Sequence, residues 1–333
     1  MSLLPSAALL VLLTALFPLT AQAVSFEGLA EHSLPFGRYV PETASRRIAG
    51  TTAWLDALEQ ATNELSVASL VQLGAGGSSN RQALVSAVFT PTVSSTSKGQ
   101  RVSVQVRLIT PQRTVEDRLR KMLHEREVLA LRAEMLKLEK EKAEEARGLI
   151  KLSATFRRTS AGADAANEER IVLLAAQLEA LWLLGITLPQ REGGCWRDPL
   201  AALSVLQQAM DLYPDYAPLQ YLRGEILLQL DRPQDALAGL DKALALNQEL
   251  AGALYARGLV YLRLQLPALA ERDLSAALAR DATHAAWWRA RGALRMIRNE
   301  VGPMCEDFAQ ACARGDCEGL AVARERGLCL AEQ

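Results

Sequence analysis

The residues best suited to chemistry in this chain are its cysteines. Cys305, Cys312, Cys317 and Cys329 lie close together near the C-terminus, whereas Cys195 stands alone. In an oxidising compartment such a cluster forms disulfides, and in a reducing one it more often holds a metal or a redox centre. A redox centre would need a C-x-x-C motif, which the cluster lacks. A four-cysteine zinc site is the competing interpretation.

The spacing of these cysteines limits how they can pair. If Cys305 and Cys312 share one helix, seven residues separate them by about 10 Å along its axis. A disulfide requires Cα atoms within about 7 Å. An antiparallel hairpin that turns near Gly315 would place Cys312 beside Cys317 and bring Cys305 toward Cys329. We therefore expect this nested pairing.

The histidines and the overall charge offer little chemistry. His32, His124 and His284 are far apart, and the sequence contains no G-x-S-x-G, H-E-x-x-H or Walker pattern. We therefore expect no catalytic residues, no metal, no cofactor and no enzyme activity. The formal net charge of −1 also argues against nucleic acid as a partner, because such proteins usually carry a basic stripe.

The N-terminus has the pattern of an export signal. An apolar run from Ala7 to Leu19 is followed by Ala21-Gln22-Ala23, a small-x-small cleavage pattern. No Lys or Arg precedes the run, so an uncleaved membrane anchor is the alternative. We expect cleavage after Ala23, a periplasmic or secreted protein, and no transmembrane span afterwards.

Residues 24–110 have the pattern of a small α+β module. The clearest strand runs from Arg101 to Ile109, where apolar residues alternate with polar ones. The glycine-rich run at 74–79 lacks the Gly-Lys-Ser/Thr ending of a phosphate-binding loop, so we interpret it as a turn. Further predictions are strands at 37–40, 67–73 and 83–93, a helix at 44–65, and a connector at 94–99.

Residues 111–166 contain a long charged helix and a linker. We predict the helix from Thr114 to Lys151 and the linker from Ser160 to Asn167. Apolar residues fall near heptad spacing at Leu119, Met122, Leu129 and Leu136, but charged residues interrupt the seam. One interpretation is a coiled coil that makes a homo-oligomer; the other, which the broken heptads favour, is a helix packed on its own chain.

The C-terminal half repeats every 34 residues, as the dipeptides Arg223-Gly224, Arg257-Gly258 and Arg291-Gly292 show. A period of this length indicates stacked helical hairpins, which present surfaces rather than active sites. We expect the three arginines to form a row that stabilises the stack through neighbouring carboxylates. The residues expected to pack the two helices of each unit are Gly224, Ala236, Leu240, Ala243, Gly258, Ala270, Leu274, Ala277, Gly292, Phe308 and Ala311.

These positions resemble the tetratricopeptide repeat (TPR). The resemblance covers about 120 residues and implies units 217–250, 251–284 and 285–318, with a degenerate unit near 183–216. The last unit is atypical, because Met304 stands where Ala is expected. Glu318–Glu325 would be a capping helix within the region 167–333.

In this repeat family the first helices of successive units line a concave groove. By position, the resemblance implies that this groove binds a peptide or helix of a protein partner. The implied groove residues are Tyr221, Glu225, Leu228, Gln229, Tyr255, Leu259, Leu262, Arg263, Arg289 and Met296, with Ala293 and Ile297 beside them.

A fainter resemblance, over residues 36–110, is to the α+β domain of flagellar assembly protein T and related envelope lipoproteins. The expected fold class is mainly α: a small α+β module, a long helix, and a TPR-like solenoid of antiparallel helix pairs. We expect an exported scaffold or assembly factor of the cell envelope, with a structural oligomer formed through the long helix as the alternative.

Overall fold

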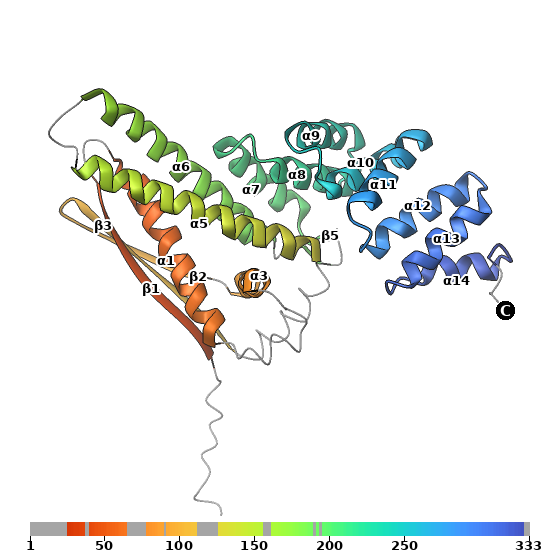
Figure 1. Cartoon of the computed structure of the whole chain (residues 1–333), viewed down its shortest axis with the longest axis horizontal. Coiled ribbons are helices and arrows are strands. Elements are labelled where there is room, and N and C mark those ends of the chain that lie inside the picture. The colour runs from red at the N-terminus through yellow and green to blue at the C-terminus, as the bar shows by residue number, and fades with distance from the viewer. Residues whose placement is uncertain are drawn as a thin grey trace, which may run out of the picture.

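The computed structural model describes residues 25–36, 40–64, 78–89, 91–111, 126–155, 161–188, 191–192 and 195–329. A layered N-terminal part of sheet and helices continues into helical repeats, which run to the C-terminus at the far end of the molecule (Figure 1). The predicted signal at 1–23 lies outside the described residues.

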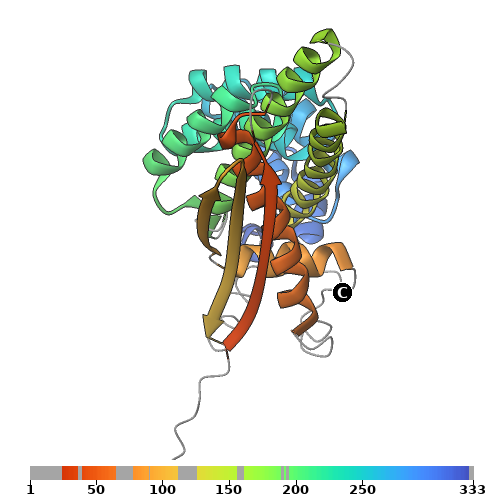
Figure 2. The same ribbon diagram turned by 90° about the vertical axis from the view of Figure 1, so that its left-hand side faces the viewer.

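The N-terminal sheet is antiparallel, with strand order β1-β3-β2. The alternation predicted for β3 is confirmed, because Val102, Val104, Val106 and Leu108 are all buried. Helix α1 covers the face on which they lie (Figure 2). Gly28 allows this approach, since a Cβ there would meet the backbone of α1. The elements are β1 (Ser25–Pro35), α1 (Glu42–Glu64), α3 (Ser78–Val88), β2 (Pro91–Lys98) and β3 (Arg101–Pro111).

Two elements of this module differ from the sequence prediction. The strand predicted at 83–93 is wrong, because α3 occupies most of it and β2 begins only at Pro91. The predicted connector at 94–99 is therefore mostly strand. The error has a physical reason: Leu84, Val85 and Val88 are buried, and a short apolar run fits a buried helix as well as a strand. Predictions at 37–39, 67–73 and 74–77 fall outside the described residues.

The long helix packs on its own chain. Helices α5 (Arg126–Thr155) and α6 (Ala161–Thr187) contact each other, and α5 also contacts α1 and α3. Met135 and Leu136 are buried, and the buried Arg132 pairs with Glu139 at 2.9 Å. Helix α5 therefore packs on its own chain, as the broken heptads favour, and residues 114–125 of the predicted helix lie outside the described residues. The loop predicted at 160–167 is wrong, because α6 begins at Ala161.

Helix α6 bears on the expectation of no transmembrane span after the signal. Within the described residues, Ala165–Thr187 is long and apolar enough to cross a membrane by length and composition, and half of its most apolar stretch is buried inside the protein. The expectation of no transmembrane span stays a prediction. Because α6 contacts α1, α5 and α7, its composition also suits a core helix.

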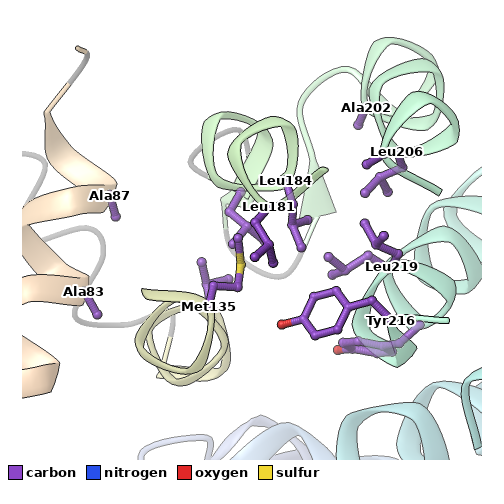
Figure 3. Packing of buried hydrophobic residues seen from close by; sticks show 14 of the residues in the cluster. Ala83, Ala87, Met135, Leu181, Leu184, Ala202, Leu206, Tyr216 and Leu219 are labelled. Atoms are coloured by element: carbon purple, nitrogen blue, oxygen red, sulfur yellow. The ribbon is translucent and has the colours of Figure 1, made fainter. Parts of the chain in front are cut away.

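The repeats adjoin the N-terminal layers through a shared apolar cluster. Met135 of α5 and Leu181 and Leu184 of α6 face Leu206 and Leu219 at the start of the repeats (Figure 3). Each of these five side chains is at most 1% exposed. The long helices and the first repeats are therefore packed together.

The C-terminal part is a solenoid of helix pairs with the predicted period. First helices begin at Ala217, Ala251 and Ala285, each 34 residues after the previous one. The predicted fold class is confirmed. The helices are α7 (Pro199–Leu212), α8 (Ala217–Gln229), α9 (Pro233–Leu246), α10 (Ala251–Arg263), α11 (Pro267–Arg280), α12 (Ala285–Ile297), α13 (Val301–Cys312) and α14 (Glu318–Glu325).

The repeated glycines lie where the two helices of a pair touch. A Cβ on Gly224 would come within 2.6 Å of Leu240, and one on Gly292 within 2.7 Å of Phe308. Gly258 lies against Leu274 in the same way. The small and large packing residues opposite them are also buried: Ala236, Leu240, Ala243, Ala270, Leu274, Ala277, Met304, Phe308 and Ala311.

The arginine that precedes each repeated glycine does not have the same kind of partner in every unit. Arg257 binds the buried Asp273 at 2.6 Å and also Asp241 of the preceding unit. Arg291 binds the buried Asp307 at 2.8 Å. These two pairs agree with the expected role of the arginines.

Arg223 departs from that pattern. The position that holds Asp273 and Asp307 in the later units is Gly239 in the first. Here α8 and α9 approach closely, since a Cβ on Gly239 would lie 3.4 Å from the carbonyl oxygen of Gln220. The expected carboxylate for Arg223 is therefore absent from this position.

The C-terminal cap contains the nested cysteine pairs. Cys305 is bonded to Cys329 and Cys312 to Cys317, with Cα–Cα distances of 5.6 and 4.0 Å. Gly315, whose φ is +97°, makes the turn between α13 and α14. Helix α14 covers the end of the last unit, as predicted for a capping helix.

Candidate binding site

A cavity of about 340 Å³ lies between α5 and the first turns of α8, α10 and α12. The 34-residue period places the three helix starts side by side along the array. The beginning of α5 runs across them, so the site combines the repeats with a helix from outside the repeats. Its size is near the lower end for ligand pockets, which suits a side chain or short segment.

The wall of the cavity is mostly apolar and closely packed. Val128 and Leu131 come from α5, and Tyr221, Leu250 and Trp287 come from the repeat side. Trp287 is only 2% exposed, because its ring packs between those of Tyr255 and His284, with centroid distances of 5.2 and 4.3 Å. These stacked rings make the repeat side of the cavity a preformed surface.

The polar groups of the lining lie at two places. Glu134 of α5 is exposed, and Asp281, Thr283 and His284 precede α12. The Asp281 carboxylate accepts hydrogen bonds from the backbone N–H and hydroxyl of Thr283, and His284 Nε2 lies 3.0 Å from it. Partial burial alone would raise the pKa of Asp281, but these hydrogen bonds hold it below its usual value. Asp281 is therefore negatively charged at neutral pH.

The structure brings few of the predicted groove residues into this cavity. Tyr221 lines it, and the Tyr221 hydroxyl donates to Glu225 at 2.8 Å. Gln229 instead holds a short insertion, because its side chain bonds to both the N–H and the carbonyl of Trp196. The insertion is the hairpin of β4 (Arg191–Glu192) and β5 (Cys195–Trp196), which carries the exposed Cys195.

The two predicted groove arginines are held by their own chain. Arg263 binds Asp231 at 2.8 Å, and Arg289 binds Asp316 at 2.8 Å and Glu318 at 3.0 Å. The remaining predicted groove residues are half-buried: Leu228, Tyr255, Leu259, Leu262, Ala293 and Met296, whereas Ile297 is 75% exposed.

The sequence pattern does not indicate the lining residues Trp287, Asp281 and His284, or any contribution from α5. Trp287 occupies the position of Leu219 and Ala253 in earlier units, two residues before the position assigned to the groove. An aromatic residue occurs at this position in one unit alone. This departure from the repeat pattern is the signal in the sequence that could have identified Trp287. The contribution of α5 has no repeat signal, because this helix lies outside the periodic region.

A second cavity, of about 410 Å³, lies among α1, α3 and α5. Its lining mixes acidic residues such as Asp56 and Glu59 with basic ones such as Lys137 and Lys140. Asp56 also lies 2.5 Å from His32 Nε2. With both charge signs present, this cavity selects no single ligand chemistry.

The 34-residue helix pairs, their glycine contacts and the capping helix define a tetratricopeptide-repeat fold. Solved structures similar to this chain include the first TPR of Spaghetti (RPAP3) bound to an HSP90 peptide. That likeness has 18% identity, a TM-score of 0.32, and covers 33% of this chain and 92% of that one. A crystal structure of MamA is 18% identical with a TM-score of 0.36, over 47% and 96% of the two chains.

PilF of Pseudomonas aeruginosa is also similar, at 16% identity and a TM-score of 0.39, over 56% of this chain and 88% of PilF. At such scores these likenesses carry no argument about activity or partners. No protein-family model and no curated protein sequence matches the chain. The resemblance of the N-terminal module to flagellar assembly protein T stays a prediction.

Proposed function

We propose that this chain is an exported TPR protein that binds a short segment of another protein in the cavity between α5 and the repeats. The observation that carries the proposal is the preformed apolar cavity of about 340 Å³, with charged groups at its edge. Such a combination of apolar wall and few polar groups is typical of binding sites. The export signal and the absence of recognisable catalytic motifs favour a scaffold or assembly role in the cell envelope.

The binding proposal is tested by selecting random peptides displayed on phage against the mature chain. Ala130 lines the cavity from the exposed side of α5, so Ala130→Trp fills the cavity without replacing a buried residue. We expect peptides that are enriched on the wild type and lost on Ala130→Trp, with equal melting temperatures for both proteins. Equal enrichment on both, or none on either, would contradict the proposal.

Tyr221→Ala and Tyr255→Ala are poor tests of binding. Tyr221 is 6% exposed and Tyr255 stacks on Trp287, so truncation of either ring removes core packing. Loss of binding in these variants could not be separated from loss of structure.

The export proposal is tested separately by mass spectrometry of the protein from fractionated cells. We expect a chain that begins at Val24 in the soluble envelope fraction. A chain that retains Met1 in the membrane fraction would instead support the anchor.

A further inference from the structure

We infer that the segment bound in this cavity presents a lysine or arginine side chain. The inference rests on the proposed function and adds the chemistry of the partner. Its basis is the charge of the lining: Glu134 and Asp281 contribute carboxylates, and no Lys or Arg is among the described residues that line the cavity. The depressed pKa of Asp281 keeps its charge at neutral pH.

Glu134 is the carboxylate available to a ligand. It is exposed on α5, and within the described part of the chain no hydrogen bond or ion pair engages it. The Asp281 carboxylate is already held by Thr283 and His284, so it contributes charge more than a new hydrogen bond. An incoming cation would therefore form an ion pair with Glu134, and the Asp281 carboxylate would attract it at longer range.

The arginines that the structure describes near the cavity do not offset this charge. Arg263 and Arg289 each bind carboxylates of their own chain, as described above. Arg132 of α5 is buried and paired with Glu139. Among the described residues that line the cavity, an acidic segment would thus meet two carboxylates and no Lys or Arg, which disfavours it.

The first turns of α8, α10 and α12 lie at the cavity, so the helix ends also contribute charge there. A helix N-terminus carries about half a positive charge, which is screened at exposed positions and falls off within one turn. Asp281, the C-cap residue of α11, lies three residues before the N-cap His284 of α12, so its negative charge partly offsets that end. The full negative charge of Glu134 therefore determines the sign of the electrostatic potential beside the described part of α5.

The apolar wall fits the same kind of side chain. Lys and Arg carry long methylene stems that pack along apolar surfaces while the charged head stays in polar surroundings. In this cavity the stem would contact Val128, Leu131 and Tyr221, and the head would reach Glu134 at the rim. A purely apolar side chain would gain no ion pair with Glu134.

The test uses peptides from the phage selection, synthesised and titrated by calorimetry against the mature chain. We expect a Lys or Arg at one fixed position, whose replacement by Gln weakens binding about fivefold, as for a partly exposed ion pair. Glu134→Gln should weaken the basic peptide about fivefold and leave its Gln version unchanged. Added salt should reduce the difference between the two peptides.

Glu141→Gln is the matched control, because Glu141 is an exposed carboxylate on the same helix that does not line this cavity. It should leave both affinities unchanged. Selected peptides that share an acidic or purely apolar residue, or a Glu134→Gln variant that keeps the full wild-type preference for the basic peptide, would overturn the inference while the binding proposal stood. Failure of the Ala130→Trp comparison would instead remove the binding proposal itself.

Discussion

The first and last complete repeats of this solenoid each consist of two antiparallel helices. Different contacts hold the two helices together in each repeat. In the first, Gly224 and Gly239 let α8 and α9 approach closely. In the last, the buried Asp307 binds both Arg291 and Arg295, and two disulfides fasten the end.

The difference follows from where the two repeats lie. The first has neighbours on both sides, since its residues belong to the apolar cluster shared with α5 and α6. The last has only the short α14 beyond it. A terminal unit lacks one packing interface, and here ion pairs and covalent bonds stabilise the unit that lacks it.

The largest expected effect is that of Asp307→Ala, which leaves Arg291 and Arg295 without their buried partner. Removing one member of a buried pair costs about 3–5 kcal/mol. Native-state hydrogen exchange should show this loss in α12 and α13. Asp241→Ala, at an exposed carboxylate that binds Arg257, should cost no more than about 1 kcal/mol. Similar losses from both variants would contradict the comparison.

Removal of the disulfides should cause the next largest loss of stability. Joining Cys305 to Cys329 spans 24 residues, against five for Cys312 and Cys317. From loop closure alone, replacing the first pair by alanine should cost about 3 kcal/mol and the second about 2 kcal/mol. Dithiothreitol should lower protection from exchange in α13 and α14 and leave α8 and α9 unaffected. Equal loss in all four helices would refute a local role.

The glycine contacts should have a smaller effect, common to the repeats. Gly258→Ala places a methyl group within 2.9 Å of Leu274, and such overpacking costs about 1–3 kcal/mol. Gly148→Ala is the control, because nothing lies within 4 Å of that position in α5. It should stabilise the protein by about 1 kcal/mol through helix propensity. Destabilisation by Gly148→Ala would count against packing as the cause.

The smallest effect is expected for Arg223→Gln, because Gly239 stands where the later units have aspartate. A surface change of this kind stays within about 0.5 kcal/mol. Arg257→Gln should be much more damaging, since it leaves the buried Asp273 with only the exposed Arg272. Chemical denaturation of both variants measures the difference in their free energies of unfolding. Equal denaturation midpoints for Arg223→Gln and Arg257→Gln would contradict this prediction and show that the row of arginines acts as one unit.

The parts of the fold that the sequence could predict are those with a repeated or alternating pattern. The 34-residue period locates Gly258 against Leu274, and the alternation in β3 locates Val104 and Val106 on the buried face. The helix α3 was missed because Leu84 and Val85 form a short apolar run, which does not distinguish helix from strand.

The candidate site was only partly accessible to the same reasoning. Tyr221 could be assigned because it occupies a position that the repeat resemblance places in the groove. The period says nothing about which other helix lies across the groove, so Glu134 and Val128 could not be assigned to it. Nor does it show that Arg289 is bound by Asp316 and Glu318.

By itself the sequence determined the helix pairs and favoured the nested cysteine pairing. The reason is that these depend on local spacing: 34 residues bring each glycine to the same contact, and the turn at Gly315 fixes which cysteines meet. The tertiary structure alone decided the site. Its cavity exists because α5, distant in sequence, lies across the first helices of the repeats, and no local pattern encodes that approach.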